Sequence, residues 1–164
     1  MQLLTKPYLT MQRELDQVIM TNHQVTYKNT KKERFLALFV ELSELANESR
    51  SFKYWSKKSP SPRAVLLDEY ADGIHFFFSL ALAYELTLPE TVEASDTNED
   101  LTTHFLSVIT SVTKFYEAPC TATFVTSLSM YLSLGKALYF SESDIKDAYD
   151  KKMMVNYKRQ ENDY

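Results

Sequence analysis

The sequence predicts an all-α fold, and three observations support this prediction. Apolar residues recur every three or four positions over long stretches, as they do along one face of an α-helix. Only two glycines occur, Gly73 and Gly135, so glycine interrupts very little of the chain. The prolines lie where the periodic stretches break, as expected for long helices joined by short turns: Pro7, Pro60, Pro62, Pro89 and Pro119.

Length and composition indicate a single domain. The chain has 164 residues, 45% of them hydrophobic, which is enough for one sizeable core. No stretch resembles a linker between two cores, so we expect residues 1–164 to form one unit. The single cysteine, Cys120, excludes an internal disulfide framework and is typical of a reducing compartment.

The sequence also limits the localisation and the partners. Its first residues lack the cationic and then apolar pattern of a signal peptide. The most apolar stretch, residues 74–88, is too short for a membrane span and contains His75 and Glu85. We therefore expect a cytoplasmic protein with no membrane partner. The net charge of −4 argues against nonspecific nucleic-acid binding, although local basic clusters could still hold a small anion.

The first predicted helix borders a pocket. Met11, Leu15 and Val18 recur at helical spacing and form its apolar stripe. Gln12 and Asp16 each directly follow a residue of that stripe in the sequence, so they lie at its edge on the helix surface. An amide and a carboxyl group are therefore expected at the rim of the pocket.

Two further helices follow. Thr30 and Glu33 have the spacing of a capping box, which would open a second helix that ends near Arg50. A third helix is expected over about 62–87, with Ser61 as its N-cap and a proline in its first turn. The segment between these two helices breaks the pattern and is expected to be a loop.

The second half of the chain predicts three more helices. Asp96 with Glu99 could cap a fourth, in which apolar residues follow a 4-3-4-3 spacing. Residues 121–139 are so rich in threonine and serine that propensity alone would allow a strand, but their spacing favours a helix. Ser141 with Asp144 would cap a last helix that runs into the basic, tyrosine-rich tail.

Two matched pairs of carboxylates are the most informative feature: Glu41-x-x-Glu44 and Glu69-x-x-Asp72. Residues three apart share a helix face, so side-by-side helices would bring four negative charges into a bundle interior. Such a group needs bound cations or protonation, and hard divalent cations with oxygen ligands, such as Mg²⁺, fit it. Two surface helices with acids three apart are the ordinary alternative. The apolar surroundings of Glu69 and Asp72 favour metal binding.

An aromatic residue follows on the same face. Phe76 lies close to the line of Glu69 and Asp72, with His75 beside it, and Gly73 leaves room for a group to approach. A nucleotide base could stack on this ring, and the imidazole could hydrogen-bond to the base. Core packing of Phe76 and a satisfied, buried His75 would explain the same spacing equally well.

Basic and aromatic residues surround the acidic helices in the sequence. In the loop after the second helix, Lys57 could hold a phosphate and the indole N–H of Trp55 could donate to a base edge. In the tail, Lys152 and Arg159 offer charge, with Asn156 on the same predicted helix. A solvated basic loop and a basic amphipathic helix are the alternatives.

Four segments carry a resemblance to a known family: MQRELD, VELSELANESRSFKYWSKK, LLDEYADGIHFFFSL and AYDKKMMVNYKRQ. They resemble the all-α, dimeric dUTP pyrophosphatases, within the larger MazG-like group of all-α nucleoside-triphosphate pyrophosphohydrolases. The resemblance spans about residues 8–160, with little from residues 88–140. Trp55, the pair His75 and Phe76, and the N-x-x-R-Q tail point to the deoxyuridine branch.

This resemblance implies a helical bundle, with a four-helix core plus extra helices, that works as a homodimer. It implies hydrolysis of dUTP, with dUDP as a second candidate substrate, to dUMP, which keeps uracil out of DNA and supplies dUMP. It also implies two or more Mg²⁺ ions, with Glu41 or Glu44 positioning the attacking water. The implied metal ligands are Glu41, Glu44, Glu69 and Asp72.

The resemblance further implies a set of substrate contacts. Gln12, Trp55 and His75 would read the uracil edges while Phe76 stacks on the ring. Phosphates or sugar would be held by Lys57, Lys152, Asn156 and Arg159.

Two positions depart from the family pattern. Asp16 stands where members often carry asparagine, and a carboxylate cannot donate, so that base contact would be lost or mediated by water. Met153 follows Lys152 where the tail often has a polar residue. Both departures concern substrate preference more than hydrolysis.

Three alternatives remain open at this point. A related pyrophosphohydrolase could act on another nucleotide, such as dCTP or a modified one, although Trp55 and His75 favour uracil. A carboxylate-bridged di-iron bundle would need two E-x-x-H pairs, and only Asp72-x-x-His75 approximates one. A non-catalytic helical protein could bind a partner protein through aromatic surfaces, but the intact carboxylates argue against it.

Overall fold

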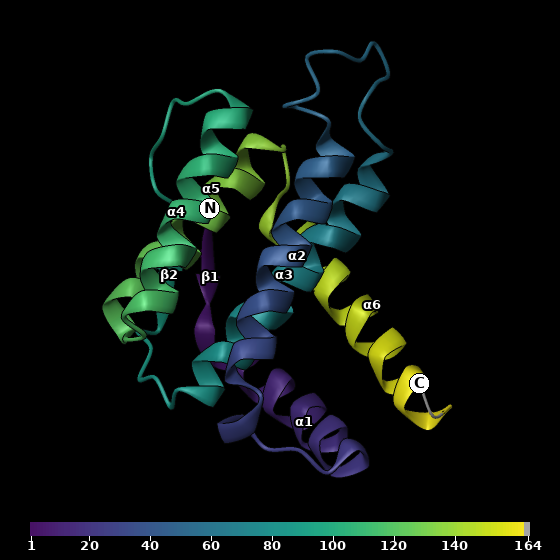
Figure 1. Ribbon diagram of the computed structural model, residues 1–164, viewed down its shortest axis with the longest axis vertical. Coiled ribbons are helices and arrows are strands. Elements are labelled where there is room, and N and C mark those ends of the chain that lie inside the picture. The colour runs from purple at the N-terminus through teal and green to yellow at the C-terminus, as the bar shows by residue number, and fades with distance from the viewer. Residues whose placement is uncertain (163–164) are drawn as a thin grey trace.

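The computed structural model describes residues 1–162, and over this range six α-helices, one 3₁₀ helix (η1, Tyr27–Asn29) and two short strands make up the fold (Figure 1). The all-α prediction is confirmed in its main part, and the serine- and threonine-rich stretch is largely helical, as predicted. The helices are α1 (Thr5–His23), α2 (Lys31–Ser49), α3 (Arg63–Ala83), α4 (Leu101–Glu117), α5 (Thr121–Ala137) and α6 (Glu142–Glu161).

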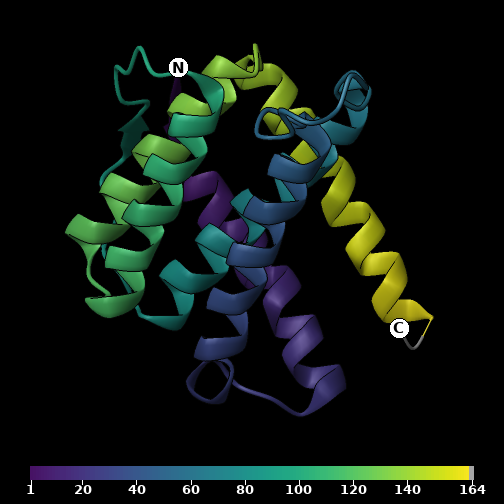
Figure 2. The ribbon, with the colours of Figure 1, turned by 45° about the horizontal axis from the view of Figure 1, so that its top comes forward.

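Helix α3 lies at the centre of the bundle. It packs against α1, α2, α5 and α6, while α4 pairs with α5 (Figures 1 and 2). Every residue over 77–83 is buried, which explains why this part of the sequence is apolar on nearly every side. Glu69 and Asp72, earlier in α3, are only partly buried. No helix within residues 1–162 has both the length and the apolar character needed to cross a membrane.

A small sheet is the main difference from the prediction. Strands β1 (Gln2–Leu4) and β2 (Thr91–Glu93) pair in antiparallel fashion, with Leu3 opposite Val92. Both of these side chains are buried in the core. The pair therefore ties the N-terminus to the connection between α3 and α4. Strands of three residues are too short for their alternation to be recognised in a sequence.

The predicted caps of α2 and α4 are wrong. Thr30 does not cap α2 through its side chain, because its hydroxyl donates to the carbonyl of Thr26. The capping box lies one turn earlier, between Thr26 and Asn29, and belongs to η1. Asp100, not Asp96, caps α4, and its carboxylate accepts from two backbone N–H groups of the first turn.

The bounds of α3 also differ from the prediction, whereas the cap of α6 is confirmed. Ser61 does not cap α3, because its hydroxyl donates to the carboxylate of Glu48 in α2. The helix ends at Ala83, four residues earlier than expected. Two residues later, Glu85 adopts a left-handed backbone conformation with a φ of 53°. Ser141 and Asp144 form the predicted capping box of α6.

Both glycines of the chain lie under a tyrosine ring. Tyr70 of α3 and Tyr131 of α5 stack with their centroids 4.4 Å apart, and each hydroxyl donates to the backbone carbonyl of the other residue. A Cβ atom at Gly73 would lie 2.2 Å from the Tyr131 hydroxyl, and one at Gly135 would lie 2.5 Å from the Tyr70 hydroxyl. The group for which Gly73 leaves room is therefore Tyr131 rather than a substrate.

Candidate active site

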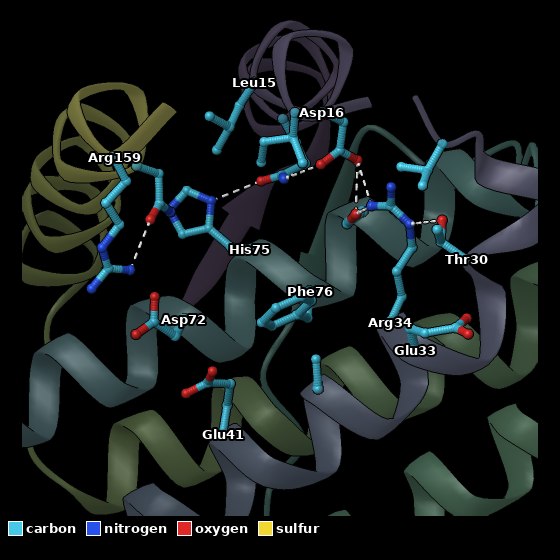
Figure 3. A pocket seen from close by; sticks show the side chains of 16 residues that line it. Leu15, Asp16, Thr30, Glu33, Arg34, Glu41, Asp72, His75, Phe76 and Arg159 are labelled. Carbon is cyan, nitrogen blue, oxygen red and sulfur yellow. Dashed lines mark hydrogen bonds and ion pairs between the residues drawn. The ribbon is translucent and has the colours of Figure 1, made fainter. Parts of the chain in front are cut away.

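A cavity of about 390 Å³ lies between α1, α2, α3 and the C-terminal part of α6 (Figure 3). Glu41 and Asp72 line one part of it, and Asp16 and Arg34 line another. Along α3, Asp72, Phe76 and Ser79 follow one another at intervals of about one turn, and all three line the cavity. The acidic part and the Arg34 part are thus about 10 Å apart along the helix, at about 1.5 Å per residue.

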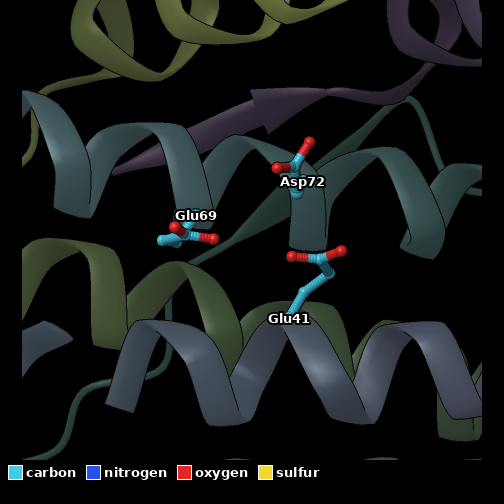
Figure 4. A group of neighbouring side chains, drawn as sticks. All are labelled: Glu41, Glu69 and Asp72. Atoms are coloured by element: carbon cyan, nitrogen blue, oxygen red, sulfur yellow. The ribbon is translucent and has the colours of Figure 1, made fainter. Parts of the chain in front are cut away.

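Three of the four predicted metal ligands come together. Glu41 of α2 and Glu69 and Asp72 of α3 each offer a carboxylate oxygen, and these oxygens lie within 4.8 Å of one another (Figure 4). Here they are called the acidic cluster. Glu44, one turn further along α2, is exposed and lies outside this group. Its charge nevertheless acts on the cluster, because it raises the pKa of both Glu41 and Glu69.

The acidic cluster is electrostatically strained in the absence of a cation. Burial, followed by the charges of Asp72, Glu44 and Glu69, raises the pKa of Glu41 to about 7. Burial and the charges of Glu44 and Asp72 raise the pKa of Glu69 to about 7, and burial raises the pKa of Asp72. Groups that resist ionisation at neutral pH become stable carboxylates when a cation binds. Three carboxylates this close, without nitrogen or sulfur ligands, fit a hard divalent ion such as Mg²⁺.

Lys152 reaches the acidic cluster from α6. Its Nζ lies 2.6 Å from Oδ2 of Asp72 and 2.8 Å from Oδ2 of Asp68, and its side chain is only 7% exposed. Burial opposes its charge, but the hydrogen bonds to both carboxylates outweigh this effect and raise the pKa of Lys152. The predicted position of Lys152 near the site is thus found in the structure, whereas its contact with Asp68 was not anticipated from the sequence.

Gln12 and His75 are buried and bonded to each other. Nδ1 of His75 lies 2.7 Å from Oε1 of Gln12, which also accepts from the Tyr149 hydroxyl at 2.9 Å. The imidazole stacks on the Tyr149 ring with centroids 3.9 Å apart. Burial lowers the pKa of His75 to about 3, so the ring is neutral. Nε2 also faces an acceptor, the backbone carbonyl of Tyr149 at 3.3 Å, and a neutral imidazole has one N–H. We assign the proton to Nδ1, because its contact with the amide oxygen is the shorter of the two.

Asp16 is held by three donors and is part of a buried ion pair. Its Oδ1 accepts from Gln12 Nε2 at 2.9 Å, and its Oδ2 accepts from Ser79 at 2.7 Å and from Arg34 Nη1 at 3.0 Å. Arg34 also bonds Ser79 and donates from Nε to the hydroxyl of Thr30. The side chains of Asp16 and Arg34 are 3% and 10% exposed. The carboxylate that departs from the family pattern is therefore neutralised by an arginine.

Sequence reasoning missed Arg34. The available signal was its position seven residues before Glu41, two turns earlier on the same face of the same helix. A basic residue on the same face of α2 as Glu41 belongs to the same cavity wall. Its partner Asp16 could not be inferred, because no local spacing relates α1 to α2.

The other predicted site residues divide into two groups. Phe76, Asn156 and Arg159 line the cavity, and Arg159 Nη1 lies 3.3 Å from Oδ1 of Asn156. Trp55 and Lys57 do not line it. Both are exposed in the loop between α2 and α3, and Trp55 is 66% exposed, with edge-on contacts to neighbouring aromatic rings.

Comparison with known proteins identifies a family for this chain. A family model described as dUTPase matches residues 5–164, which is nearly the whole chain. A search of curated proteins found no match.

Proposed function

Because this chain belongs to the all-α dUTPase family and is a dUTP diphosphatase, we propose that dUTP binds in the cavity with its phosphates at the acidic cluster and its base near Gln12. The observation that carries this proposal is the arrangement of one cavity. Carboxylates that suit a metal lie in one part, and a buried polar network runs along α3 from His75, about 4.5 Å beyond Asp72, to Ser79, about 10 Å beyond it. The far end of this network lies at a separation comparable to the reach of an extended deoxynucleotide from its α-phosphate to the far edge of a pyrimidine.

Catalysis in this family depends on a metal, and we assign its ligands to Glu41, Glu69 and Asp72. Bound Mg²⁺ would supply charge neutralisation on the phosphate oxygens and a more acidic water. We also propose two or more ions. The carboxylate of Glu44 is close enough to the acidic cluster to act on Glu41 but is not one of the three that form it. A carboxylate in this place suits the role of the base that orients and deprotonates the attacking water.

The side chains of α6 bind the phosphates in this proposal. Lys152 is paired with Asp72 of the acidic cluster, and Arg159 and Asn156 line the same cavity. Charge that develops on the leaving pyrophosphate would be stabilised by these groups. The same contacts would serve dUDP, which we therefore include as a candidate substrate.

Phe76 offers its ring to the base, and Gln12 offers the remaining N–H of its amide. His75 acts on the base indirectly, because its Nδ1–H already donates to the amide oxygen of Gln12. This assigns His75 a positioning role in place of the direct reading of uracil that the resemblance implies. The neutral state of the imidazole supports this role, since it donates to Gln12 without adding charge to the pocket.

A homodimer is also part of the proposal. The loop that contains Trp55 and Lys57 is exposed and lies outside the cavity lining of its own chain. Phe52, Tyr54 and Trp55 together present an aromatic surface. A contact of this surface with a second copy would bury it and could bring Trp55 and Lys57 to a nucleotide. Size-exclusion chromatography with light scattering measures the oligomeric state.

The test is a substrate panel with a matched pair of variants. The protein is incubated with Mg²⁺ and dUTP, dUDP, dCTP, dTTP or UTP, and the release of monophosphate is measured. We expect preferential turnover of dUTP and a loss of about 100-fold or more in kcat for Glu44→Gln. Glu48→Gln, one turn further along α2 and bonded to Ser61 instead, is the control.

Each outcome has a distinct meaning. Preference for another nucleotide would keep the acidic cluster and contradict the assignment of the base contacts. Equal activity of the Glu44→Gln and Glu48→Gln variants would exclude Glu44 as the base. Calorimetric titration of Mg²⁺ tests the ligands separately, because Asp72→Asn should abolish binding whether or not nucleotide is present.

A further inference from the structure

Arg34 is a buried cation in the part of the cavity remote from the acidic cluster (Figure 3). Nη1 is paired with Asp16 at 3.0 Å, and Nε donates to Thr30 at 3.0 Å. One face of the guanidinium lies over the ring of Tyr27, with its central carbon 4.9 Å from the ring centroid. A planar group held at two nitrogens and one face has a fixed orientation, so its remaining N–H groups also have a fixed direction.

The remaining nitrogen, Nη2, makes no hydrogen bond to any residue over 1–162. Buried polar groups normally have partners, and the side chain lines the cavity and stays 10% exposed. Asp16 cannot read the base in its place. All three of its bonds are to protein donors, and a carboxylate has no proton to give. The charged donor available to a ligand here is therefore the arginine.

We propose that Arg34 is a specificity-determining residue, which donates from Nη2 to the 4-oxo oxygen of uracil, and that Asp16 is a positioning residue that holds the guanidinium. This inference rests on the proposed function, because it needs the base to lie in this part of the cavity. Cytosine carries an amino group where uracil carries the 4-oxo group. A cationic donor facing that amino group repels it and leaves both groups unpaired, so Arg34 selects uracil over cytosine.

Thymine provides an internal control for this inference. It has the same 4-oxo group as uracil and differs from it only by a methyl group at position 5. Arg34 therefore does not distinguish dUTP from dTTP, and any discrimination between these two must come from elsewhere in the cavity. A change at Arg34 should alter one specificity ratio and leave the other unchanged.

The variant for the test is Arg34→Lys. It keeps a positive charge beside Asp16, so no unpaired carboxylate is left buried, but it removes the planar fork and Nη2. The matched control is Arg13→Lys on α1, where the arginine is exposed and outside the cavity lining. Thermal unfolding establishes that both variants are folded.

The measurement is kcat/KM for dUTP, dCTP and dTTP with Mg²⁺. In Arg34→Lys we expect the ratio of dUTP to dCTP to fall by about 10- to 100-fold, the value of one hydrogen bond to a charged group, and the ratio of dUTP to dTTP to stay constant. Arg13→Lys should leave both ratios unchanged. A folded Arg34→Lys variant with an unchanged dUTP to dCTP ratio would overturn the proposal and reduce Arg34 to a partner of Asp16.

A second measurement does not depend on any variant. Calorimetry compares the binding of dUMP to the wild-type protein with that of the deoxynucleotide of 2-pyrimidinone, which lacks the 4-oxo group. We expect weaker binding of this analogue by about tenfold or more, and equal binding would contradict the proposal. A wild-type protein that hydrolyses no nucleotide would instead indicate that the proposed function itself is wrong.

Discussion

Lys152 and Asp72 form the closest ion pair of the site, with Nζ of the lysine 2.6 Å from Oδ2 of the aspartate. The side chain of Lys152 is 7% exposed and that of Asp72 is 18% exposed, so water screens the pair weakly. Because Asp72 is also a proposed metal ligand, the lysine and the metal act on one carboxylate. The two cations therefore influence each other directly.

The first prediction concerns this competition. Replacing Lys152 by Met leaves the acidic cluster more negative, so we expect it to bind Mg²⁺ more tightly while kcat/KM for dUTP falls, because a phosphate contact is lost. The metal-free variant should lose roughly 1–3 kcal/mol of unfolding free energy. Calorimetric Mg²⁺ titration, kinetics and denaturant unfolding measure the three effects. Lys151→Met, at the exposed neighbouring position, is the control, and weaker Mg²⁺ binding in Lys152→Met would contradict the argument.

The second prediction concerns pH. The pKa values of Glu41 and Glu69 rise from 4.5 to about 7 on folding, so between these values the folded state holds more protons than the unfolded state. The stability of the metal-free protein should therefore fall as the pH rises from about 4.5 to about 7. Mg²⁺ should reverse most of this loss above pH 7. Thermal unfolding across this range, with and without Mg²⁺, measures both effects. In Glu41→Gln the slope should be smaller, and an unchanged slope would contradict this origin.

The third prediction tests the packing between α3 and α5. Gly73→Ala places a Cβ atom against the Tyr131 hydroxyl, and we expect a loss of roughly 2–3 kcal/mol of unfolding free energy despite the better helix propensity of alanine. Tyr131→Phe alone should cost about 1 kcal/mol, since it removes one buried hydrogen bond.

A double-mutant cycle completes this test. The combination of Gly73→Ala with Tyr131→Phe should cost less than the sum of the two single changes, because the hydroxyl is the nearest atom in the clash. If the two losses of unfolding free energy simply add, the clash with the Tyr131 hydroxyl is not what destabilises Gly73→Ala. Tyr139→Phe, whose ring is 88% exposed, is the control and should have no effect.

The fourth prediction separates stability from activity. The carboxylate of Asp100 accepts from the N–H groups of Thr102 and Thr103 at the start of α4, away from the cavity lining. Asp100→Ala should cost about 1 kcal/mol of unfolding free energy and leave kcat/KM for dUTP unchanged at temperatures where the protein is folded. Asp96→Ala, at the acid expected from the sequence to cap this helix, should have little effect on stability. Equal losses would indicate that both acids contribute to the cap.

The features that depend on spacing within one helix were predictable from the sequence. Glu69 and Asp72 share a face of α3 because they are three residues apart, and Glu41 lies on the facing side of α2. The cap of α6 follows from Ser141 and its neighbours. These patterns are local, but the equally local spacing of Thr30 and Glu33 forms no cap, so a pattern must also fit the path of the chain.

The features that depend on contacts between distant segments were not predictable. Arg34 pairs with Asp16, 18 residues away in another helix, and Leu3 lies opposite Val92 across the small sheet. No periodicity encodes such pairs. At the start of α4 the sequence predicted Asp96 as the cap, but Asp100 lies four residues later and the path of the chain places it there. The role of Trp55 stays a prediction, because its loop lies outside the cavity of its own chain.

The reciprocal contacts of Tyr70 and Tyr131 have a consequence for how this protein can change. Each ring occupies the space that a side chain would need on the other helix, at Gly73 and Gly135. A larger residue at either glycine first requires a smaller ring opposite, and a smaller ring leaves a void until the glycine is replaced. The four positions therefore form two pairs, Gly73 with Tyr131 and Gly135 with Tyr70. In each pair, the order in which the two residues can be substituted is restricted. Since Gly73 follows Asp72 directly, this restriction also preserves the backbone that carries a proposed metal ligand.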